Sequence, residues 1–293
     1  MIYIKEAGIL LKETFLLWKE SNPFNNSIII AYYTIFSLPG LLIIIINTAS
    51  YFYDKEEVTM QITDQIQSVM GGDTAKDIEA IVSKAGEKKS NVVSSILGIL
   101  TLLFGATGVF YELQQMLNMI WNVKAKPKTR QKILGHLRDR LFSFGLILVV
   151  GFLLLVSLVL SAGLSAVSGW VALHWSEELN SVFRILDILF SIGIITLLFA
   201  AIFKFLPDVN VHWKGVWMGA FLTAFLFVIA KFALGFYFGQ STFSSMYGAA
   251  GSIVLIMLWV SYTGLILLFG AEFTFVYAQR YGIKKSDLGK KIN

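Results

Sequence analysis

The fold is decided by an apolar stretch near the start of the chain, residues 27–53, which reads SIIIAYYTIFSLPGLLIIIINTASYFY. None of its 27 residues carries a charge. A helix rises about 1.5 Å per residue, so roughly 20 apolar residues are enough to cross the hydrocarbon core of a bilayer. We therefore predict a membrane-spanning helix here. A cleaved signal peptide is not expected, because its apolar core is shorter and is followed by a small-residue cleavage site.

The chain as a whole is also rich in apolar residues and poor in charged ones. Of its 293 residues, 56% are hydrophobic and 15% are charged, whereas a soluble domain averages about 45–50% apolar and about 25% charged residues. Apolar stretches of this length predict an all-α, polytopic membrane protein with six transmembrane helices. The predicted spans are Ser27–Tyr53, Asn91–Trp121, Leu141–Gly169, Val182–Phe205, Gly215–Phe238 and Tyr247–Tyr277.

The distribution of basic residues predicts the orientation of these spans. Seventeen Lys and Arg residues lie in the N-terminal segment, in the loops after spans two and four, and in the tail. The other side of the predicted membrane has five, all in the first loop, where eight Asp and Glu residues outnumber them. Because cytoplasmic loops are enriched in Lys and Arg, both termini are predicted to be cytoplasmic.

Residues 1–26 are predicted to form a cytoplasmic interfacial helix that precedes a six-span membrane domain, residues 27–293. Lys-Glu pairs recur every seven residues, which aligns them in one stripe of a helix. An ordinary cytoplasmic tail is the alternative. The pairs are Lys5-Glu6, Lys12-Glu13 and Lys19-Glu20, and the apolar side includes Leu10, Leu11, Leu17 and Trp18.

The first loop, residues 54–90, is predicted to form an external helical hairpin. Val58, Ile62, Ile66 and Met70 recur every four residues, and the pattern breaks at Gly71-Gly72-Asp73 before it resumes. This periodicity is typical of two helices joined by a turn. The hairpin is either a lid over a vestibule or a packing cap.

Residues that carry catalysis or bind metals are sparse. Cysteine is absent, which excludes disulfides and thiol chemistry. The three histidines, His136, His174 and His212, lie in or beside different loops. No hydrolase, phosphate-loop or metal motif is present in the sequence. We therefore expect no catalytic residue, no metal and no cofactor, and a protein that is not an enzyme.

Charged residues inside the predicted spans are the candidate transport-path positions, because an ionisable group at bilayer depth costs at least about 2.5 kcal/mol. Arg184 and Asp187 lie three residues apart near the outer end of span four. Lys231, in the outer half of span five, is predicted to pair with Asp187. Glu112 and Glu272 lie toward the inner ends of spans two and six. The alternatives are a buried ion pair that fixes helix register and a Glu272 side chain that reaches the interface.

Two further features are candidates for a role. Pro39 interrupts span one, removes a backbone hydrogen bond and is a candidate hinge. The basic loop after span two is predicted to contact anionic lipid headgroups at the cytoplasmic face. Its candidate residues are Lys124, Lys126, Lys128, Arg130 and Lys132.

Several short motifs, in order along the chain, resemble the YihY/BrkB family of bacterial inner-membrane proteins, also called UPF0761. The C-terminal signature comprises Tyr247-Gly248-Ala249-Ala250-Gly251-Ser252, Leu258-Trp259 and Leu268-Phe269-Gly270-Ala271-Glu272-Phe273. Other matching pieces are Ala31-Tyr32-Tyr33, Phe36-Ser37, Ile120-Trp121-Asn122, Phe205-Leu206-Pro207-Asp208, Trp213-Lys214 and Gly219-Ala220.

The resemblance implies a six-span protein of the bacterial cytoplasmic (inner) membrane. Members were once labelled ribonuclease BN, a label generally regarded as misassigned, and one is linked to serum resistance. Handling of envelope lipid or lipopolysaccharide has been suggested for relatives. The family implies no agreed catalytic or transport residues. Its Gly-Ala-Glu motif maps onto Gly270, Ala271 and Glu272, which strengthens Glu272 as a candidate.

Two functions remain open at this point. One is a carrier or flippase for an amphiphilic or anionic envelope compound, with the intramembrane charges along its path. The other is a non-transporting scaffold or lipid-binding integrity factor in which those charges are structural; a channel is a lesser alternative. The sequence argues against a ribonuclease, and no nucleic-acid partner is expected, because nothing supplies a base, a nucleophile or a metal. Membrane lipids are the expected partners, and an oligomer is possible.

The predicted orientation can be tested by labelling, because the chain has no cysteine of its own. A single cysteine placed in the loop 54–90 should react with a membrane-impermeant maleimide added to the outside of the inner membrane. Labelling of that cysteine only from the cytoplasmic side would show that the topology is wrong.

Overall fold

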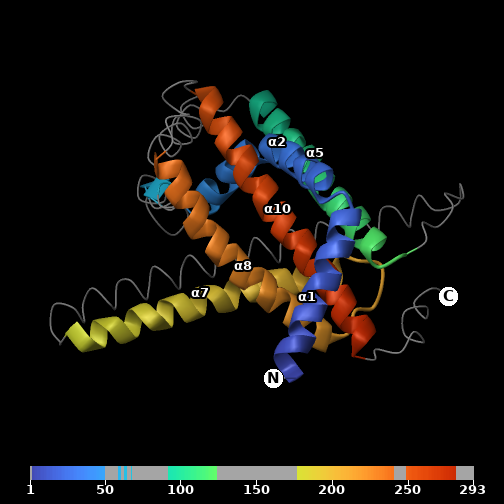
Figure 1. The fold of residues 1–293 in the computed structure, drawn as a ribbon. Helices are drawn as coiled ribbons and strands as arrows, with labels where there is room; N and C mark the ends of the chain where they lie inside the picture. The colour runs from blue at the N-terminus through green and yellow to red at the C-terminus, as the bar shows by residue number, and fades with distance from the viewer. Residues whose placement is uncertain are drawn as a thin grey trace, which may run out of the picture. The chain divides into compact units, whose positions relative to one another are not determined.

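The computed structural model describes residues 2–49, five residues between 59 and 67, and residues 92–123, 177–240 and 249–281. Every regular element in these ranges is a helix, which confirms the all-α prediction for the described part of the chain (Figure 1). The elements are α1 (Ile2–Glu20), α2 (Pro23–Ala49), α5 (Val92–Ile120), α7 (Glu177–Phe205), α8 (Trp213–Gln240) and α10 (Ala249–Arg280).

Five of the six predicted spans coincide with one of these helices, α2, α5, α7, α8 and α10. By length and composition, α8 and α10 can cross a bilayer, over Trp213–Tyr237 and Ile253–Arg280. Only 22% and 33% of their most apolar windows are buried, unlike the core helices of a soluble protein. The third span, 141–169, and the turn after α8 lie outside the described residues. The six-span topology and the orientation of the termini stay predictions.

Of the predicted hairpin 54–90, only a few residues fall in the described part of the chain. Thr59, Met60, Thr63, Asp64 and Gln67 are helical, and the hairpin itself stays a prediction. The basic loop after span two begins directly after the last described residue of this region, Val123.

The junction of α1 and α2 is set by two residues. Asn22 has a φ of 51°, in the left-handed region that asparagine tolerates better than most residues. Pro23 follows as the first residue of α2, where its fixed φ suits a helix and its missing N–H is not needed. The side-chain amide of Asn26 also donates a hydrogen bond to the Ser21 carbonyl, 2.9 Å away. The chain therefore ends one helix and begins the next within two residues.

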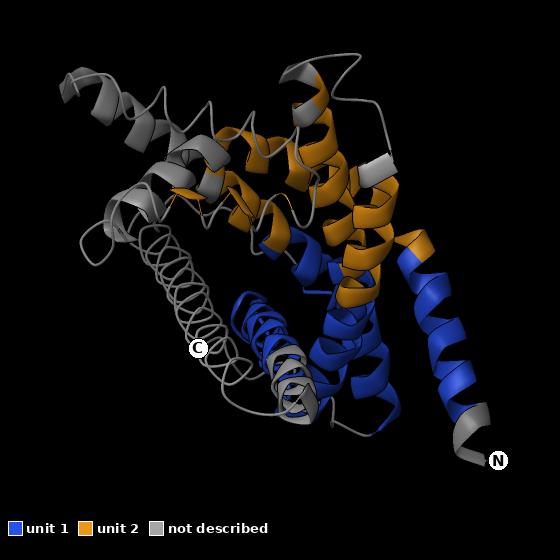
Figure 2. Cartoon of the chain, turned by 90° about the vertical axis from the view of Figure 1, so that its left-hand side faces the viewer, with its two compact units in different colours: residues 1–18, 114–226, 267–293 blue, residues 19–113, 227–266 orange. Residues whose placement is uncertain are grey.

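The chain divides into two compact units, coloured in Figure 2. Unit 1 comprises residues 1–18, 114–226 and 267–293, and unit 2 comprises residues 19–113 and 227–266. Helices α5, α8 and α10 each contribute one part to each unit.

In unit 2, glycines allow α2 to pack closely against its neighbours. A Cβ atom on Gly105 would lie 2.8 Å from the backbone nitrogen of Ser37, and one on Gly108 would meet the Tyr33 ring. Position 105 therefore faces 37 and position 108 faces 33, so α5 runs antiparallel to α2. On α10, a Cβ on Gly264 would lie 3.1 Å from the Cβ of Ser27.

In unit 1, α8 and α10 cross through two glycine-threonine pairs with the same four-residue spacing. A Cβ on Gly219 of α8 would collide with the hydroxyl of Thr274, and one on Gly270 of α10 would collide with the hydroxyl of Thr223. The hydroxyl of Thr223 donates to the Gly219 carbonyl (2.6 Å), and that of Thr274 donates to the Gly270 carbonyl (2.7 Å). Each threonine thus satisfies its hydroxyl within its own helix and presents its surface to the opposite glycine.

The glycine in each of two identical pentapeptides lies at one of these close contacts. Leu-Leu-Phe-Gly-Ala occurs at residues 102–106 and again at 267–271. Its glycine meets Ser37 in unit 2 and Thr223 in unit 1. In both copies, therefore, the missing side chain makes room for a small hydroxyl residue of another helix.

Helix α1 packs against the second half of α10 within unit 1 (Figure 1). The ring of Trp18 makes an edge contact with that of Phe269, with centroids 6.0 Å apart. The Glu13 carboxylate pairs with the Arg280 guanidinium at 3.2 Å. Leu10 and Thr14 are buried, so these two residues mark the packed side of α1.

The glycine at the α8–α10 crossing should be essential for stability. We expect Gly270→Ala to lower the free energy of unfolding by about 1–3 kcal/mol, because the added methyl group overpacks the contact with Thr223. Thermal unfolding of the protein in detergent measures the effect.

Gly193→Ala is the matched control, since a Cβ there meets nothing within 4 Å. This change should leave stability unaltered or raise it slightly through better helix propensity. Equal stability of the two variants would contradict the role of the crossing.

Candidate functional site

Glu272 of α10 is the one buried charged residue among the side chains that the structure describes, with 4% of its surface exposed. It lies in a run of buried residues from Ala271 to Val276. Its role in a transport path stays a prediction. A carboxylate at such a site must be neutralised, hydrogen-bonded or paired, because burying an isolated charge is very costly.

The neighbours of Glu272 along α10 show which side of the helix it occupies. Successive residues of a helix are about 100° apart, so Glu272 projects about 60° from both Phe269 and Phe275. Phe269 contacts Trp18 of α1, and Phe275 contacts Trp121 at the end of α5, with centroids 5.4 Å apart. Glu272 therefore projects from α10 between the side facing α1 and the side facing Trp121, all within unit 1.

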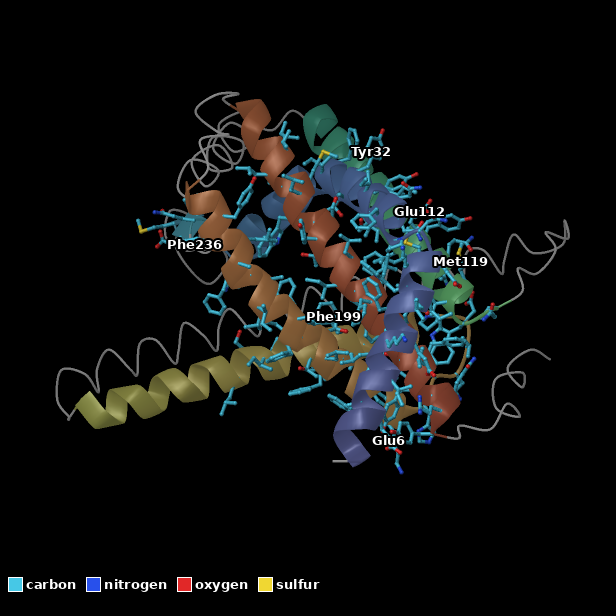
Figure 3. The ribbon with its side chains drawn as sticks, viewed as in Figure 1. Glu6, Tyr32, Glu112, Met119, Phe199 and Phe236 are labelled. Carbon is cyan, nitrogen blue, oxygen red and sulfur yellow. The ribbon has the colours of Figure 1, made fainter. Side chains whose placement is uncertain are left out.

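The other acidic candidate, Glu112, is half-buried on α5 and belongs to unit 2 (Figure 3). Glu272 belongs to unit 1, so the predicted inner acidic cluster of these two residues stays a prediction.

The predicted outer group is only partly described. Lys231 is half-buried on α8 in unit 2. Arg184 and Asp187 lie three residues apart on α7, as predicted, but their side chains lie outside the described residues. The pairing of Lys231 with Asp187 therefore stays a prediction.

Two further sets of candidates can be located only in part. Pro39 lies inside α2, which continues as a helix on both sides of it; the hinge stays a prediction. The proposed lipid contacts Lys124, Lys126, Lys128, Arg130 and Lys132 lie outside the described residues.

Sequence reasoning missed a polar cluster that joins α5 to the loop between α7 and α8. The Asp208 carboxylate accepts hydrogen bonds from the side-chain amides of Asn118 (2.7 Å) and Gln114 (3.2 Å). In return, the backbone N–H of Asp208 donates to the side-chain oxygen of Asn118 at 2.8 Å. Gln114 and Asn118 lie four residues apart, on one face of α5. That spacing is the signal from which the cluster could have been found.

The end of α5 next to this cluster is a Schellman motif. Asn122 has a φ of 52°, its N–H donates to the Met119 carbonyl, and the Val123 N–H donates to the Asn118 carbonyl at 2.9 Å. A residue in the left-handed conformation is needed at this position, and asparagine is the usual choice after glycine. This explains the asparagine in the motif Ile120-Trp121-Asn122.

The loop after α7 is also held from its other side. The Lys204 ammonium donates to the side chain of Asn210 (2.8 Å) and to the Val211 carbonyl (2.5 Å). It also lies 5.4 Å from the centre of the Trp213 ring, a cation–π distance. Residues 206–212 are thus fixed to α5 through Asp208 and to α7 through Lys204.

The contact between Asn118 and Asp208 should be measurable as an energetic coupling. In a double-mutant cycle, Asn118→Ala and Asp208→Ala should be less than additive by about 1 kcal/mol, because each change removes the hydrogen bond between the Asn118 amide and the Asp208 carboxylate. Thermal unfolding in detergent provides the four stabilities. Met119→Ala, at an exposed neighbouring position (Figure 3), should show no coupling to Asp208→Ala, and full additivity for Asn118 would contradict the prediction.

Comparison with known proteins places the chain in a family. Residues 17–292 match the family model described as "Virulence factor BrkB". A UPF0761 membrane protein of Tolumonas auensis is 32% identical over 192 residues, 64% of this chain and 58% of that protein. A UPF0761 membrane protein of Teredinibacter turnerae is 27% identical over 97% of this chain and 65% of its own length.

The UPF0761 membrane protein YihY of Shigella boydii is 26% identical over 67% of this chain and 63% of that protein. The chain thus spans between about half and two thirds of the length of the curated relatives it matches. No solved structure matches it. The match along almost the whole chain confirms the resemblance seen in the short motifs: the chain belongs to the YihY/BrkB (UPF0761) family of membrane proteins.

Proposed function

We propose that this is a multi-pass protein of the bacterial inner membrane, with both termini in the cytoplasm, and that it carries or flips an amphiphilic or anionic envelope compound across the bilayer. The observation that carries this proposal is the burial of Glu272 in an apolar helix long enough to span a membrane. Ionisable residues at such depth are costly, and in membrane proteins they mark substrate, ion or proton pathways.

The position of Glu272 along α10 supports this role. It lies eight residues before Arg280, the last residue of the helix, which corresponds to about 12 Å along the helix axis. If Arg280 lies at the cytoplasmic interface, Glu272 lies in the inner half of a hydrocarbon core about 30 Å thick. A buried carboxylate at this depth suits the inner end of a substrate or ion path.

The start of α8 supports the proposed orientation. Trp213 and Trp217 stack on one another with centroids 6.1 Å apart, and each is 45% exposed. Lys214 follows Trp213 in the sequence, and the Lys204 ammonium lies over the Trp213 ring. Tryptophan gathers at membrane interfaces and lysine gathers on the cytoplasmic side. This end of α8 therefore suits the cytoplasmic interface.

A non-transporting scaffold is the second candidate, and the packing of unit 1 favours it. The three hydrogen bonds of the Asp208 cluster hold the loop between α7 and α8 to α5 in one arrangement, whereas a carrier must alternate between two. In a scaffold, Glu272 would have a purely structural role. The two proposals differ in whether the protein accelerates lipid movement between leaflets.

The carrier proposal can be tested with the purified protein in liposomes that contain a trace of fluorescent phosphatidylglycerol. The rate at which label from the inner leaflet becomes accessible to dithionite should rise above that of protein-free liposomes. Glu272→Gln should lower the protein-dependent rate about tenfold or more, equivalent to about 1.4 kcal/mol in the barrier. Glu272→Asp should retain part of the rate, since it keeps the carboxylate.

Glu6→Gln is the matched control, because Glu6 is an exposed residue of α1, and it should leave the rate unchanged. A protein that leaves the rate at the protein-free level would favour the scaffold. A Glu272→Gln variant that is as fast as the parent would remove Glu272 from the proposed path.

A further inference from the structure

Helix α1 exposes large apolar side chains on the side away from its packed residues. Ile9, Phe15 and Leu16 are between 46% and 51% exposed, whereas Leu10 is 6% exposed. Three large apolar groups on one side of a single helix are more than isolated surface residues of a soluble domain. This side of α1 therefore calls for a partner that covers apolar surface.

Lysines lie within this apolar side. Lys12 and Lys19 are exposed and seven residues apart, which places them about 20° from one another around the helix. Phe15 lies about 60° from Lys12 on one side, and Leu16 and Ile9 lie about 40° and 60° from it on the other. We call this surface the lysine face of α1, consisting of Lys12, Lys19, Phe15, Leu16 and Ile9.

The glutamates of α1 lie on a different side. Glu13 is about 100° from Lys12 around the helix, and it pairs with Arg280 of α10. Glu6, near the start of α1 (Figure 3), and Glu20 continue the same seven-residue spacing. The pairing of Glu13 and the contact of Trp18 with Phe269 determine which way α1 faces within unit 1. The acidic charge is therefore directed toward Arg280 and the basic charge away from it.

A face that combines exposed lysines with large apolar side chains fits neither water nor hydrocarbon alone. It fits the interface of a membrane, where the apolar groups and the lysine stems enter the acyl boundary and the ammonium groups reach the phosphates. Each lysine near an anionic surface contributes about 1 kcal/mol. We infer that the lysine face of α1 is a binding surface for anionic phospholipid.

The inference rests on the chain being a membrane protein and not on transport. The flanking aromatic and aliphatic groups favour lipid over an acidic soluble protein, because a water-soluble acidic partner would leave them uncovered or would need a matching apolar groove. It also differs from the predicted contacts of the loop after span two, since it assigns the binding to a helix whose orientation is known within its unit.

Gly8 offers a site for a local probe. A Cβ there meets nothing within 4 Å, and the residue lies about 40° from Lys12, within the lysine face. The chain has no other cysteine, so Gly8→Cys can be labelled with a single nitroxide in the full-length protein. Collision of the label with lipid-soluble oxygen and with a water-soluble nickel complex reports its immersion depth.

The experiment places the labelled protein in phosphatidylcholine bilayers with increasing phosphatidylglycerol. The label should move from nickel-accessible to oxygen-accessible as phosphatidylglycerol increases. Lys12→Gln with Lys19→Gln should raise the phosphatidylglycerol fraction needed for half of the change, by up to about fivefold for each lysine, the equivalent of about 1 kcal/mol. Salt at 0.5 M should have a similar effect on the parent, because it screens exposed charges.

Two further variants separate position from net charge. Lys12→Arg with Lys19→Arg should behave as the parent does. Lys88→Gln with Lys89→Gln removes the same amount of charge from the loop 54–90. The depth of the label should then depend on phosphatidylglycerol as it does in the parent. A label that stays nickel-accessible in every bilayer would show that this face does not enter the membrane, and it would overturn the inference. This is the result expected if the natural partner of the face is a soluble protein. A change of depth that is the same in the Lys12/Lys19 double variant and the parent would also overturn it.

Discussion

Helices in a bilayer gain little from hiding apolar side chains from one another, because lipid is as apolar as leucine, and so they must approach closely to hold together. In unit 1 this constraint is met at the crossing of α8 and α10. Gly219 and Gly270 remove a side chain where the other helix places Thr274 and Thr223. Both threonine hydroxyls donate to their own helix, so the contact surface is free of unsatisfied polar groups. A Cβ on Gly270 would also lie 3.3 Å from the ring of Phe203, which brings α7 to the same place.

The crossing determines where the other side chains of α10 point. Gly270 and Thr274 face α8, so Glu272, midway between them in sequence, is turned about 160–200° away. That direction lies between the contacts of Phe269 with Trp18 and of Phe275 with Trp121. The loop after α7 is fixed separately, because its residue Asp208 binds α5 and because Lys204 of α7 donates hydrogen bonds to Asn210 and Val211. Unit 1 is therefore held by close packing between helices and by the hydrogen bonds of the loop that joins α7 to α8.

These two kinds of contact bear differently on function. Close packing at a glycine can separate and re-form without breaking hydrogen bonds, since the threonines are satisfied in either state. The Asp208 cluster, in contrast, loses three hydrogen bonds if the loop leaves α5. A moving part of a carrier would therefore be expected to slide at the helix crossing and to keep the loop attached to α5.

The sequence by itself determined the helical class, the approximate ends of five helices and the unusual character of Glu272. These are local properties: long charge-free stretches, proline at the start of α2 and asparagine at the end of α5 act through their own backbone and their immediate neighbours. Only the tertiary structure decided that Asp208 binds Asn118, 90 residues earlier, and that Thr14 is buried while Leu11 and Leu17 are exposed. Of the residues predicted for the apolar side of α1, Leu10 and Trp18 pack against the protein and Leu11 and Leu17 are exposed; the interfacial helix stays a prediction. Periodicity shows which residues share a face of a helix, but the packing of another helix determines which face is covered.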